Sequence, residues 1–335
     1  MIIDVFAHIL PKHYLDERNK RAESSFKATQ YSKLWSSNPA LIDLDTRFSI
    51  MDKYEDYLQV LTIAGPNVES ISKSEDAIEL CRIANDEMAE LVLKYPDRFV
   101  SAIACIPMSD MDAALRETDR AINDLKFRGV EIFTDVNGKP VDSPEFIPLY
   151  EKMTDYNLPV LLHPRRENKR ADYPGEAESR YLVYNNLGWP FETSAAMTRI
   201  AVGGVFERYP ALKVITHHAG GMIPYFSKRI ELAYDFYELR MGFKYETPLT
   251  KKPLDYYRMF YNDTAIQGNA AALMCAYDFF GAGHMLFGTD FPWDSQLGHR
   301  MIRETLQSVE LMDIPSSEKQ MIYEDNARKL LRLPI

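Results

Sequence analysis

Short apolar runs that alternate with longer amphipathic segments are the feature that most constrains the fold of this chain. Eight runs have the length and composition of buried strands, and segments with apolar residues at helical spacing separate them. This alternation is typical of βα units that build a parallel sheet. The eight runs are residues 1–8, 57–63, 99–106, 129–133, 158–163, 212–217, 259–264 and 285–290.

The number of units favours a closed (β/α)₈ barrel, the TIM barrel of the α/β class, over an open doubly wound sheet. A chain of 335 residues suits one such barrel, so we expect a single domain over residues 1–335. Gly220-Gly221 does not form the GxGxxG pattern of a dinucleotide-binding fold. Residues 17–40 are polar and poorly periodic, which predicts a lid or insertion over the barrel mouth. Helices are expected at 45–52, 76–95, 111–125, 144–156, 192–209, 223–237, 270–280, 300–311 and 317–331.

Composition restricts the class of protein. Hydrophobic residues make up 46% of the chain and charged residues 26%, as in ordinary globular proteins. The formal net charge of -10 disfavours binding to nucleic acid. No apolar stretch approaches the roughly 18 residues of a membrane span, and no secretory pattern opens the chain. Three cysteines without CxxC spacing argue against a disulfide framework and predict a reducing, cytoplasmic location.

Ionisable side chains stand at the ends of four predicted strands. His8 ends the first, His163 the fifth, the pair His217-His218 the sixth, and Asp290 the eighth. In a parallel barrel these strand ends meet at the face that carries the active site. Imidazole nitrogens with a carboxylate suit Zn²⁺, Mn²⁺ or Fe²⁺. A single histidine is more often a structural or surface residue, but a set at the same end of four strands favours a site.

Eight short motifs, in their order and spacing, resemble a known family. They are Ile3-Asp4-Val5-Phe6-Ala7-His8-Ile9-Leu10-Pro11, Arg47-Phe48-Ser49-Ile50-Met51-Asp52, Pro96-Asp97-Arg98-Phe99, Arg128-Gly129-Val130, His163-Pro164, Gly188-Trp189-Pro190-Phe191-Glu192-Thr193, His218-Ala219-Gly220-Gly221-Met222-Ile223-Pro224 and Gly288-Thr289-Asp290-Phe291-Pro292. The chain resembles the amidohydrolase superfamily, in the branch of aminocarboxymuconate semialdehyde decarboxylase and γ-resorcylate decarboxylase (often called amidohydrolase 2). The resemblance covers nearly the whole chain, and the motifs are more specific for the family than for one activity.

The resemblance implies a metal site. His8, His163 and Asp290 would bind one divalent transition metal, Zn²⁺ or alternatively Mn²⁺, without an organic cofactor. His218 would be a general acid/base or a fourth ligand, and Asp290 and His218 the catalytic residues. The HxGGxxP spacing selects His218, whereas strand alternation is expected to point His217 the other way.

Phe6 is the main departure from the family pattern. The first strand of the family usually ends HxH or ExH, but here the triplet is Phe6-Ala7-His8. A phenyl ring cannot bind a metal ion. Three protein ligands plus solvent still make up a catalytic zinc site, so weaker binding or a different metal is expected. The alternative is an empty site and a metal-free role.

The resemblance implies that two arginines bind the substrate. Arg47 matches an arginine that grips a substrate carboxylate, and Arg229 matches one that is donated across a homodimer interface. Guanidinium groups suit this task because they form bidentate, charge-assisted hydrogen bonds. Trp189 could line an aromatic pocket, and Arg165 and Arg166 are further candidates for binding a carboxylate.

Three functional hypotheses remain open at this stage. The first is a metal-dependent decarboxylase of a small aromatic or unsaturated carboxylic acid, a C–C lyase. In the second, the same site activates water as a hydrolase or hydratase acting on a lactone, ester, amide or double bond. The third is a non-catalytic descendant, which only Phe6 supports. The expected partner is a small carboxylic acid, with neither nucleic acid nor membrane.

Overall fold

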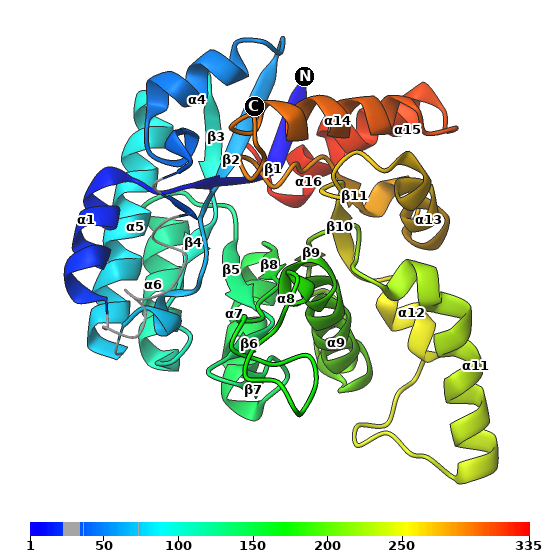
Figure 1. Ribbon diagram of the computed structural model, residues 1–335. Coiled ribbons are helices and arrows are strands. Elements are labelled where there is room, and N and C mark those ends of the chain that lie inside the picture. The colour runs from blue at the N-terminus through cyan, green and yellow to red at the C-terminus, as the bar shows by residue number, and fades with distance from the viewer. Residues whose placement is uncertain (23–33, 36, 73) are drawn as a thin grey trace.

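Parallel strands form the centre of the computed structural model and helices cover their outer side (Figure 1). The structure describes residues 1–22, 34–35, 37–72 and 74–335. Each parallel strand overlaps one of the predicted runs. The strands are β1 (Ile2–Ile9), β2 (Tyr57–Ile63), β3 (Phe99–Ala102), β4 (Ala104–Cys105), β5 (Val130–Phe133), β8 (Val160–His163), β9 (Val214–Thr216), β10 (Tyr261–Asp263) and β11 (Met285–Leu286).

The strands close into a barrel at two junctions. β3 pairs with β2 and β4 with β5, so these two short strands are halves of one strand that bends at Ile103. At the other junction, Val5 N donates to Phe287 O at 2.9 Å and His8 N to Phe291 O at 2.8 Å. Ala7 and Phe291 form a parallel bridge there. The predicted (β/α)₈ barrel is therefore confirmed.

Most helices lie where helical periodicity predicts them. The predicted helix 192–209 is wrong in one respect, because Gly203-Gly204 divides it. A Cβ on Gly203 would lie 2.2 Å from Arg199 O, and Gly204 has a φ of +89°. The helices are α1 (Lys12–Arg21), α4 (Leu44–Met51), α5 (Ser74–Lys94), α6 (Met111–Asn123), α7 (Ile147–Tyr156), α8 (Val183–Asn186), α9 (Gly188–Val202), α10 (Val205–Arg208), α11 (Ile223–Met241), α12 (Pro253–Tyr257), α13 (Ala270–Phe280), α14 (His299–Glu310), α15 (Ser316–Gln320) and α16 (Asn326–Leu330).

Shorter elements complete the chain. The Asn137-Gly138 turn joins the antiparallel hairpin strands β6 (Asp135–Val136) and β7 (Lys139–Pro140). A π-helical turn, η5 (Met321–Asp325), lies between α15 and α16 inside the predicted helix 317–331. The 3-10 turns are η1 (Pro39–Leu41), η2 (Val68–Ser70), η3 (Pro144–Phe146) and η4 (Ala282–His284).

Two apolar clusters fill the interior. The larger packs the strands against the helices. The smaller brings side chains from several strands together with Leu330, Leu331 and Leu333 at the C-terminus. This second cluster packs apolar side chains inside the barrel, and the carboxyl ends of the strands are where a barrel carries its active site.

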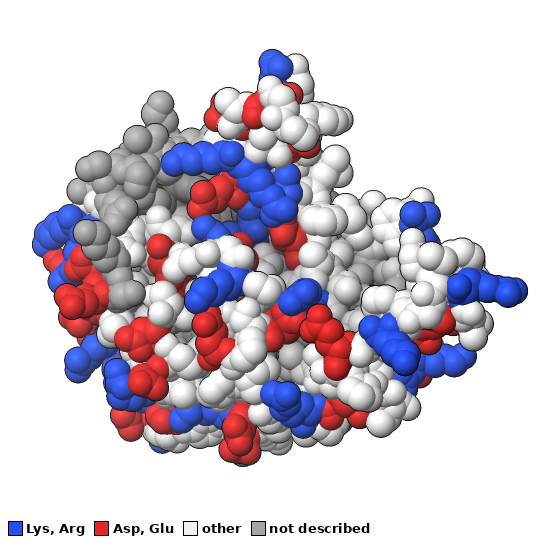
Figure 2. Space-filling view, turned by 90° about the horizontal axis from the view of Figure 1, so that it is seen from below, with Lys and Arg blue, Asp and Glu red and all other residues white. Residues whose placement is uncertain are grey.

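The outer surface carries charges of both signs. Figure 2 shows acidic and basic side chains interspersed over one face, without a continuous basic stripe. Among the described residues, no helix combines the length and the apolarity that crossing a bilayer demands.

Candidate active site

A cavity of about 790 Å³ opens at the carboxyl ends of the strands. The four residues predicted for the metal site line it: His8 on β1, His163 at the end of β8, His218 after β9 and Asp290 after β11. A volume of this size is typical of small-molecule sites. Aromatic rings form further parts of the wall, namely Phe133, Trp189 and Trp293.

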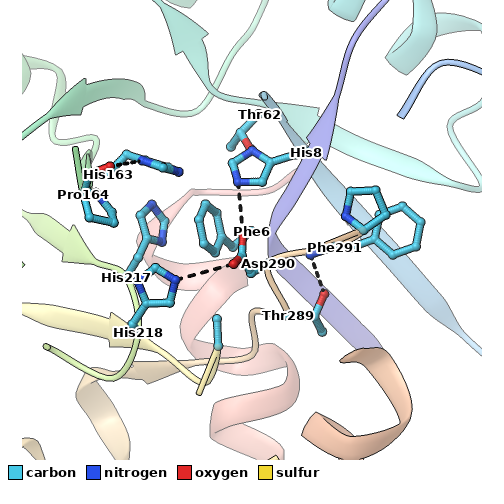
Figure 3. A network of polar contacts seen from close by, with 12 residues as sticks. Phe6, His8, Thr62, His163, Pro164, His217, His218, Thr289, Asp290 and Phe291 are labelled. Carbon is cyan, nitrogen blue, oxygen red and sulfur yellow. Dashed lines mark hydrogen bonds and ion pairs between the residues drawn. The ribbon is translucent and has the colours of Figure 1, made fainter. Parts of the chain in front are cut away.

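Asp290 connects two of the imidazoles (Figure 3). Its Oδ1 lies 3.2 Å from His8 Nε2, and its Oδ2 accepts a hydrogen bond from His218 Nε2 at 3.5 Å. Burial alone would raise the pKa of this carboxyl, but the two imidazoles hold it well below its usual range. Asp290 has a φ of 62°, a left-handed conformation that few residues other than glycine adopt. The chain turns here and directs the carboxylate into the cavity.

The residues before Asp290 explain how its segment is held. A Cβ on Gly288 would lie 2.8 Å from Asp263 Cβ and 3.2 Å from Phe6 Cβ, so the close approach requires glycine. Thr289 Oγ1 donates to Asp4 Oδ2 at 2.5 Å, and Thr289 N donates to Asp4 Oδ1 at 3.1 Å. The buried Asp4 therefore ties the segment after β11 to β1, which brings Asp290 next to His8.

His8 and His163 are both buried, and each is oriented through its Nδ1 atom. His8 Nδ1 lies 2.9 Å from Thr62 Oγ1. His163 Nδ1 donates to the carbonyl of Pro164 at 2.7 Å, so its Nε2 keeps a lone pair. Burial, with His8 and His217 nearby, lowers the pKa of His163 well below its usual value. His163 is therefore a neutral base with a free ring nitrogen.

The two histidines after β9 differ in their surroundings. His218 lines the cavity, whereas His217 is fully buried behind it, with its ring stacked on Phe6 at 3.5 Å and its Nδ1 donating to Asp263 Oδ2 at 2.6 Å. The expectation that His217 points the other way is wrong, because β9 ends at Thr216 and His218 has a left-handed φ of 59°. Strand alternation no longer applies beyond Thr216, and both rings turn inward.

The charge state of His218 depends on its neighbours. Burial alone would lower its pKa, but its hydrogen bond to Asp290 and the charges of Asp290 and Asp263 raise the pKa above the usual value. Asp263 also accepts from His218 N at 2.9 Å. His218 Nδ1 is buried and lacks a hydrogen-bond partner within the described part of the chain. The ring can therefore carry a proton at the cavity wall.

Phe6 lies among the imidazoles (Figure 3). Its ring is stacked on that of His217 and meets three others edge to face, with centroid distances of 4.6 Å to His8, 5.6 Å to His163 and 6.1 Å to His218. A hydrocarbon ring thus stands where the family pattern has its first metal ligand. The aromatic packing fills this space and supplies no donor atom.

The imidazole and carboxylate donors of the site are of the types that divalent transition metals prefer. Metal-binding imidazoles commonly have the second ring nitrogen hydrogen-bonded, as His163 does. His8 Nε2 and Asp290 Oδ1 lie 3.2 Å apart, so both residues would contribute to holding an ion. As placed, however, no three His, Cys, Asp or Glu side chains of the described residues group closely enough to hold an ion. Phe6 adds no donor atom, so a bound ion would depend on His8, His163 and Asp290 moving closer together.

Arg47 is not placed as the resemblance suggests. It is fully buried and does not line the cavity. Its Nη1 donates to His8 O at 2.7 Å, its Nε donates to Gln59 Oε1 at 2.8 Å, and its guanidinium carbon lies 4.7 Å from the Phe291 ring centroid. The structure thus corrects the expectation that Arg47 grips a substrate carboxylate, because its charge is enclosed by the barrel wall. Arg47 supports the β1 backbone at His8.

The other two predicted substrate-binding residues lie apart from each other. Trp189 lines the cavity, with its ring centroid 5.8 Å from that of His163 and its Nε1 donating to Arg166 O at 3.3 Å. Arg229 is exposed on α11 and does not line the cavity of its own chain. Its role across a dimer interface stays a prediction.

The predicted lid, 17–40, is only partly described. Residues 23–33 and 36 lie outside the described residues. Leu34, Ser37 and Asn38 line the cavity, and Asn38 Nδ2 donates to Pro292 O at 2.6 Å. The end of this segment therefore borders the cavity beside Asp290, while its function as a lid stays a prediction.

Sequence reasoning missed the residues that support the site. Asp263, at the end of β10, bonds both histidines after β9, and Asp4 and Thr62 orient the Asp290 segment and His8. Asp263 lies at the end of β10, and this position was a usable signal in the sequence. Asp4 and Thr62 lie inside apolar runs, where only tertiary contacts reveal a role.

Comparisons with known proteins agree on one family. The family model described as "Amidohydrolase" matches residues 3–333. A γ-resorcylate decarboxylase from Polaromonas sp. strain JS666 is 31% identical, covering 88% of this chain and 89% of that protein. A 2-amino-3-carboxymuconate-6-semialdehyde decarboxylase from Dictyostelium discoideum is 26% identical over 99% of this chain and 91% of that protein.

A solved structure of a decarboxylase has the same fold as this chain. The dihydroxybenzoic acid decarboxylase from Polaromonas sp. JS666, with bound manganese and the inhibitor 2-nitroresorcinol, aligns with a TM-score of 0.79 and 28% identity. The alignment covers 99% of this chain and 96% of that chain. This chain therefore belongs to the amidohydrolase family, in the branch of the γ-resorcylate and aminocarboxymuconate semialdehyde decarboxylases.

Proposed function

We propose that this chain is a metal-dependent decarboxylase of a small aromatic or unsaturated carboxylic acid. The observation that carries the proposal is the group of His8, His163, His218 and Asp290 at the wall of one cavity. The aromatic rings in the same wall suit a flat, unsaturated substrate. Relatives that match most of the chain are decarboxylases, which supports this reaction over others at the same site.

The side chains of the cavity supply what decarboxylation needs. When the bond to the carboxylate breaks and CO₂ leaves, the electron pair stays on the ring carbon, which must receive a proton. His218 Nε2 faces the cavity and bonds Asp290, so the pair holds a proton at the wall. We assign His218 as the proton donor, with Asp290 orienting it and stabilising its charged form.

We propose one divalent transition metal, held by His8, His163 and Asp290, with no organic cofactor. Manganese is bound in the Polaromonas structure, and zinc is what the imidazole and carboxylate donors predict. When bound, the ion would polarise the carboxylate or a neighbouring oxygen of the substrate. Elemental analysis of protein purified without chelators will identify the metal.

The activity is tested with a panel of hydroxybenzoic and muconic-type acids, followed by ultraviolet absorbance and by CO₂ release. We expect CO₂ from at least one acid, and a loss of about a hundredfold or more in His218→Asn. Ring opening of lactones without CO₂ release from any acid would instead establish the hydrolase. Absence of both activities, with substoichiometric metal unchanged in His163→Ala, would point to the non-catalytic descendant.

We further propose a homodimer through α11, which lies at the periphery in Figure 1. Large apolar side chains on this helix are exposed: Tyr225 at 79%, Leu232 at 67% and Leu239 at 82%. An apolar face of this kind marks an interaction surface, and twofold symmetry is the commonest way to cover it. Arg229 lies on the same helix. Light scattering should give twice the chain mass, and Leu232→Glu with Leu239→Glu should give monomers.

The cytoplasmic location is also a proposal. Cys81 Sγ and Cys105 Sγ are unbonded at 3.5 Å, and Cys275 is free as well. Cysteines without disulfides are usual in a reducing compartment. Fractionation of the native host should recover the protein with cytoplasmic markers.

A further inference from the structure

Two of the three cysteines are in contact where an outer helix packs on the barrel. Cys81 on α5 and Cys105 at the end of β4 have their Sγ atoms 3.5 Å apart, although they stand 24 positions apart in the chain. The sulfur atoms of a disulfide are about 2 Å apart, so closure requires a shift of about 1.5 Å, shared by two side chains. Cys275, on α13, takes no part in this contact.

Asn85 holds the two backbones at this spacing. It lies one helical turn after Cys81 on α5, so the two side chains share a face of the helix. Asn85 Oδ1 accepts a hydrogen bond from Cys105 N at 2.9 Å, and its Nδ2 donates to Cys105 O at 2.9 Å. Asn85 is fully buried, which shields both bonds from water. The contact between the thiols is therefore built into the packing of α5 on β4.

The two thiols differ in their surroundings. Cys81 is fully buried, whereas Cys105 is half-buried and borders a small cavity of about 10 Å³. Burial raises the pKa of Cys81 well above its usual range, and the Cys105 thiol and the Glu69 carboxyl add to this effect. Cys81 therefore stays protonated, and an oxidant from solvent meets Cys105 first. Neither cysteine lines the cavity of the candidate active site.

We propose that Cys105 and Cys81 form a reversible disulfide when the protein meets hydrogen peroxide. The inference does not depend on the proposed decarboxylase activity. Cys105 Sγ attacks one peroxide oxygen, the O–O bond breaks, and the released hydroxide leaves as water with the Cys105 proton. Cys81 Sγ then attacks Cys105 Sγ of the resulting sulfenic acid, the S–O bond breaks, and the hydroxyl leaves as water with the Cys81 proton. Peroxide is thus reduced to water, and both thiols are oxidised.

The disulfide has two consequences for the protein. It ties α5 to β4 covalently, and a cross-link between positions 24 apart restricts the unfolded chain, so the folded state gains stability. It also protects Cys105, because a sulfenic acid without a partner thiol is oxidised further to a sulfinic acid that thiols do not reduce. Disulfides that form transiently in the cytosol commonly serve such redox responses.

Treatment of the folded full chain with hydrogen peroxide, followed by alkylation and peptide mass mapping, tests the pair. We expect one disulfide between Cys81 and Cys105 that dithiothreitol reverses, and a Tm about 3 °C or more above that of the reduced protein. Cys275→Ser, the matched control, should form the same bond. Cys81→Ala should accumulate sulfinic acid at Cys105, whereas Cys105→Ala should keep an unmodified Cys81.

Retention of all three thiols in the folded wild-type protein, with oxidation only after unfolding in urea, would overturn the proposal. So would sulfinic acid at Cys105 of the wild-type protein beside a free Cys81, because the two sulfurs would then fail to meet. Oxidation of Cys81 in Cys105→Ala would refute the order of attack, and an unchanged or lower Tm would refute the gain in stability. The wild-type measurements decide the proposal even if the Cys81→Ala variant does not fold.

Discussion

Glu131 gives a sharp test of the barrel interior. It lies on β5, is 6% exposed, and its Oε1 has no hydrogen-bond partner within the described part of the chain. By strand alternation it shares a side of β5 with Phe133, which lines the cavity. Burial raises the pKa of Glu131 to about 8, because a charged carboxylate loses its hydration there.

The raised pKa sets the sign and the size of the change in the free energy of unfolding with pH. Below the ordinary value of 4.5 the group is neutral in both states, and above about 8 it is charged in both. Between these values the folded chain binds more protons, so the free energy of unfolding falls as pH rises. At 1.36 kcal/mol for each pH unit, the full difference is about 5 kcal/mol. About 2 kcal/mol of this falls between about pH 6.5 and about pH 9.

Glu131→Gln should remove this dependence. Urea unfolding curves at about pH 6.5 and about pH 9 should show the wild-type protein losing about 2 kcal/mol more than the variant. Asp4, whose pKa burial raises to about 6, is present in both proteins, so its contribution near pH 6.5 cancels in the comparison. Glu178→Gln, at an exposed position, should follow the wild-type protein. If the unfolding free energies of the wild-type protein and Glu131→Gln changed by the same amount between the two pH values, Glu131 would not be an uncompensated buried carboxyl.

Three further predictions concern the candidate site. Phe6→His should restore the missing ligand and increase metal affinity by about tenfold or more, measured by competition with a chelator; unchanged affinity would show that position 6 is not part of the site. His218→Asn should lower kcat by about a hundredfold or more with metal content unchanged, whereas loss of metal would identify His218 as a ligand. Arg47→Met should lower the free energy of unfolding by about 3 kcal/mol, since His8 O and Gln59 lose their buried donor. A rise in KM at unchanged stability would instead favour the substrate-binding role inferred from the resemblance.

Much of the fold could be predicted because its determinants are local. The alternation of apolar strands and amphipathic helices depends on periodicities that are written in consecutive residues. Gly203-Gly204 limited the prediction, since the break in the helix depends on a positive φ and on the space beside Arg199 O. The π-helical turn inside residues 317–331 likewise has no counterpart in the apolar pattern.

By itself, the sequence determined the barrel and the convergence of His8, His163 and Asp290, because parallel strands of a closed barrel present their carboxyl ends to one cavity. Tertiary structure decided where side chains go once the strands end. His217 and His218 both turn inward because the backbone becomes left-handed, and Asp263 from the next strand fixes them. Arg47 is enclosed and Arg166 is paired with Glu192 because their partners come from distant segments. Charge pairing depends on such contacts, which neighbouring residues along the chain do not reveal.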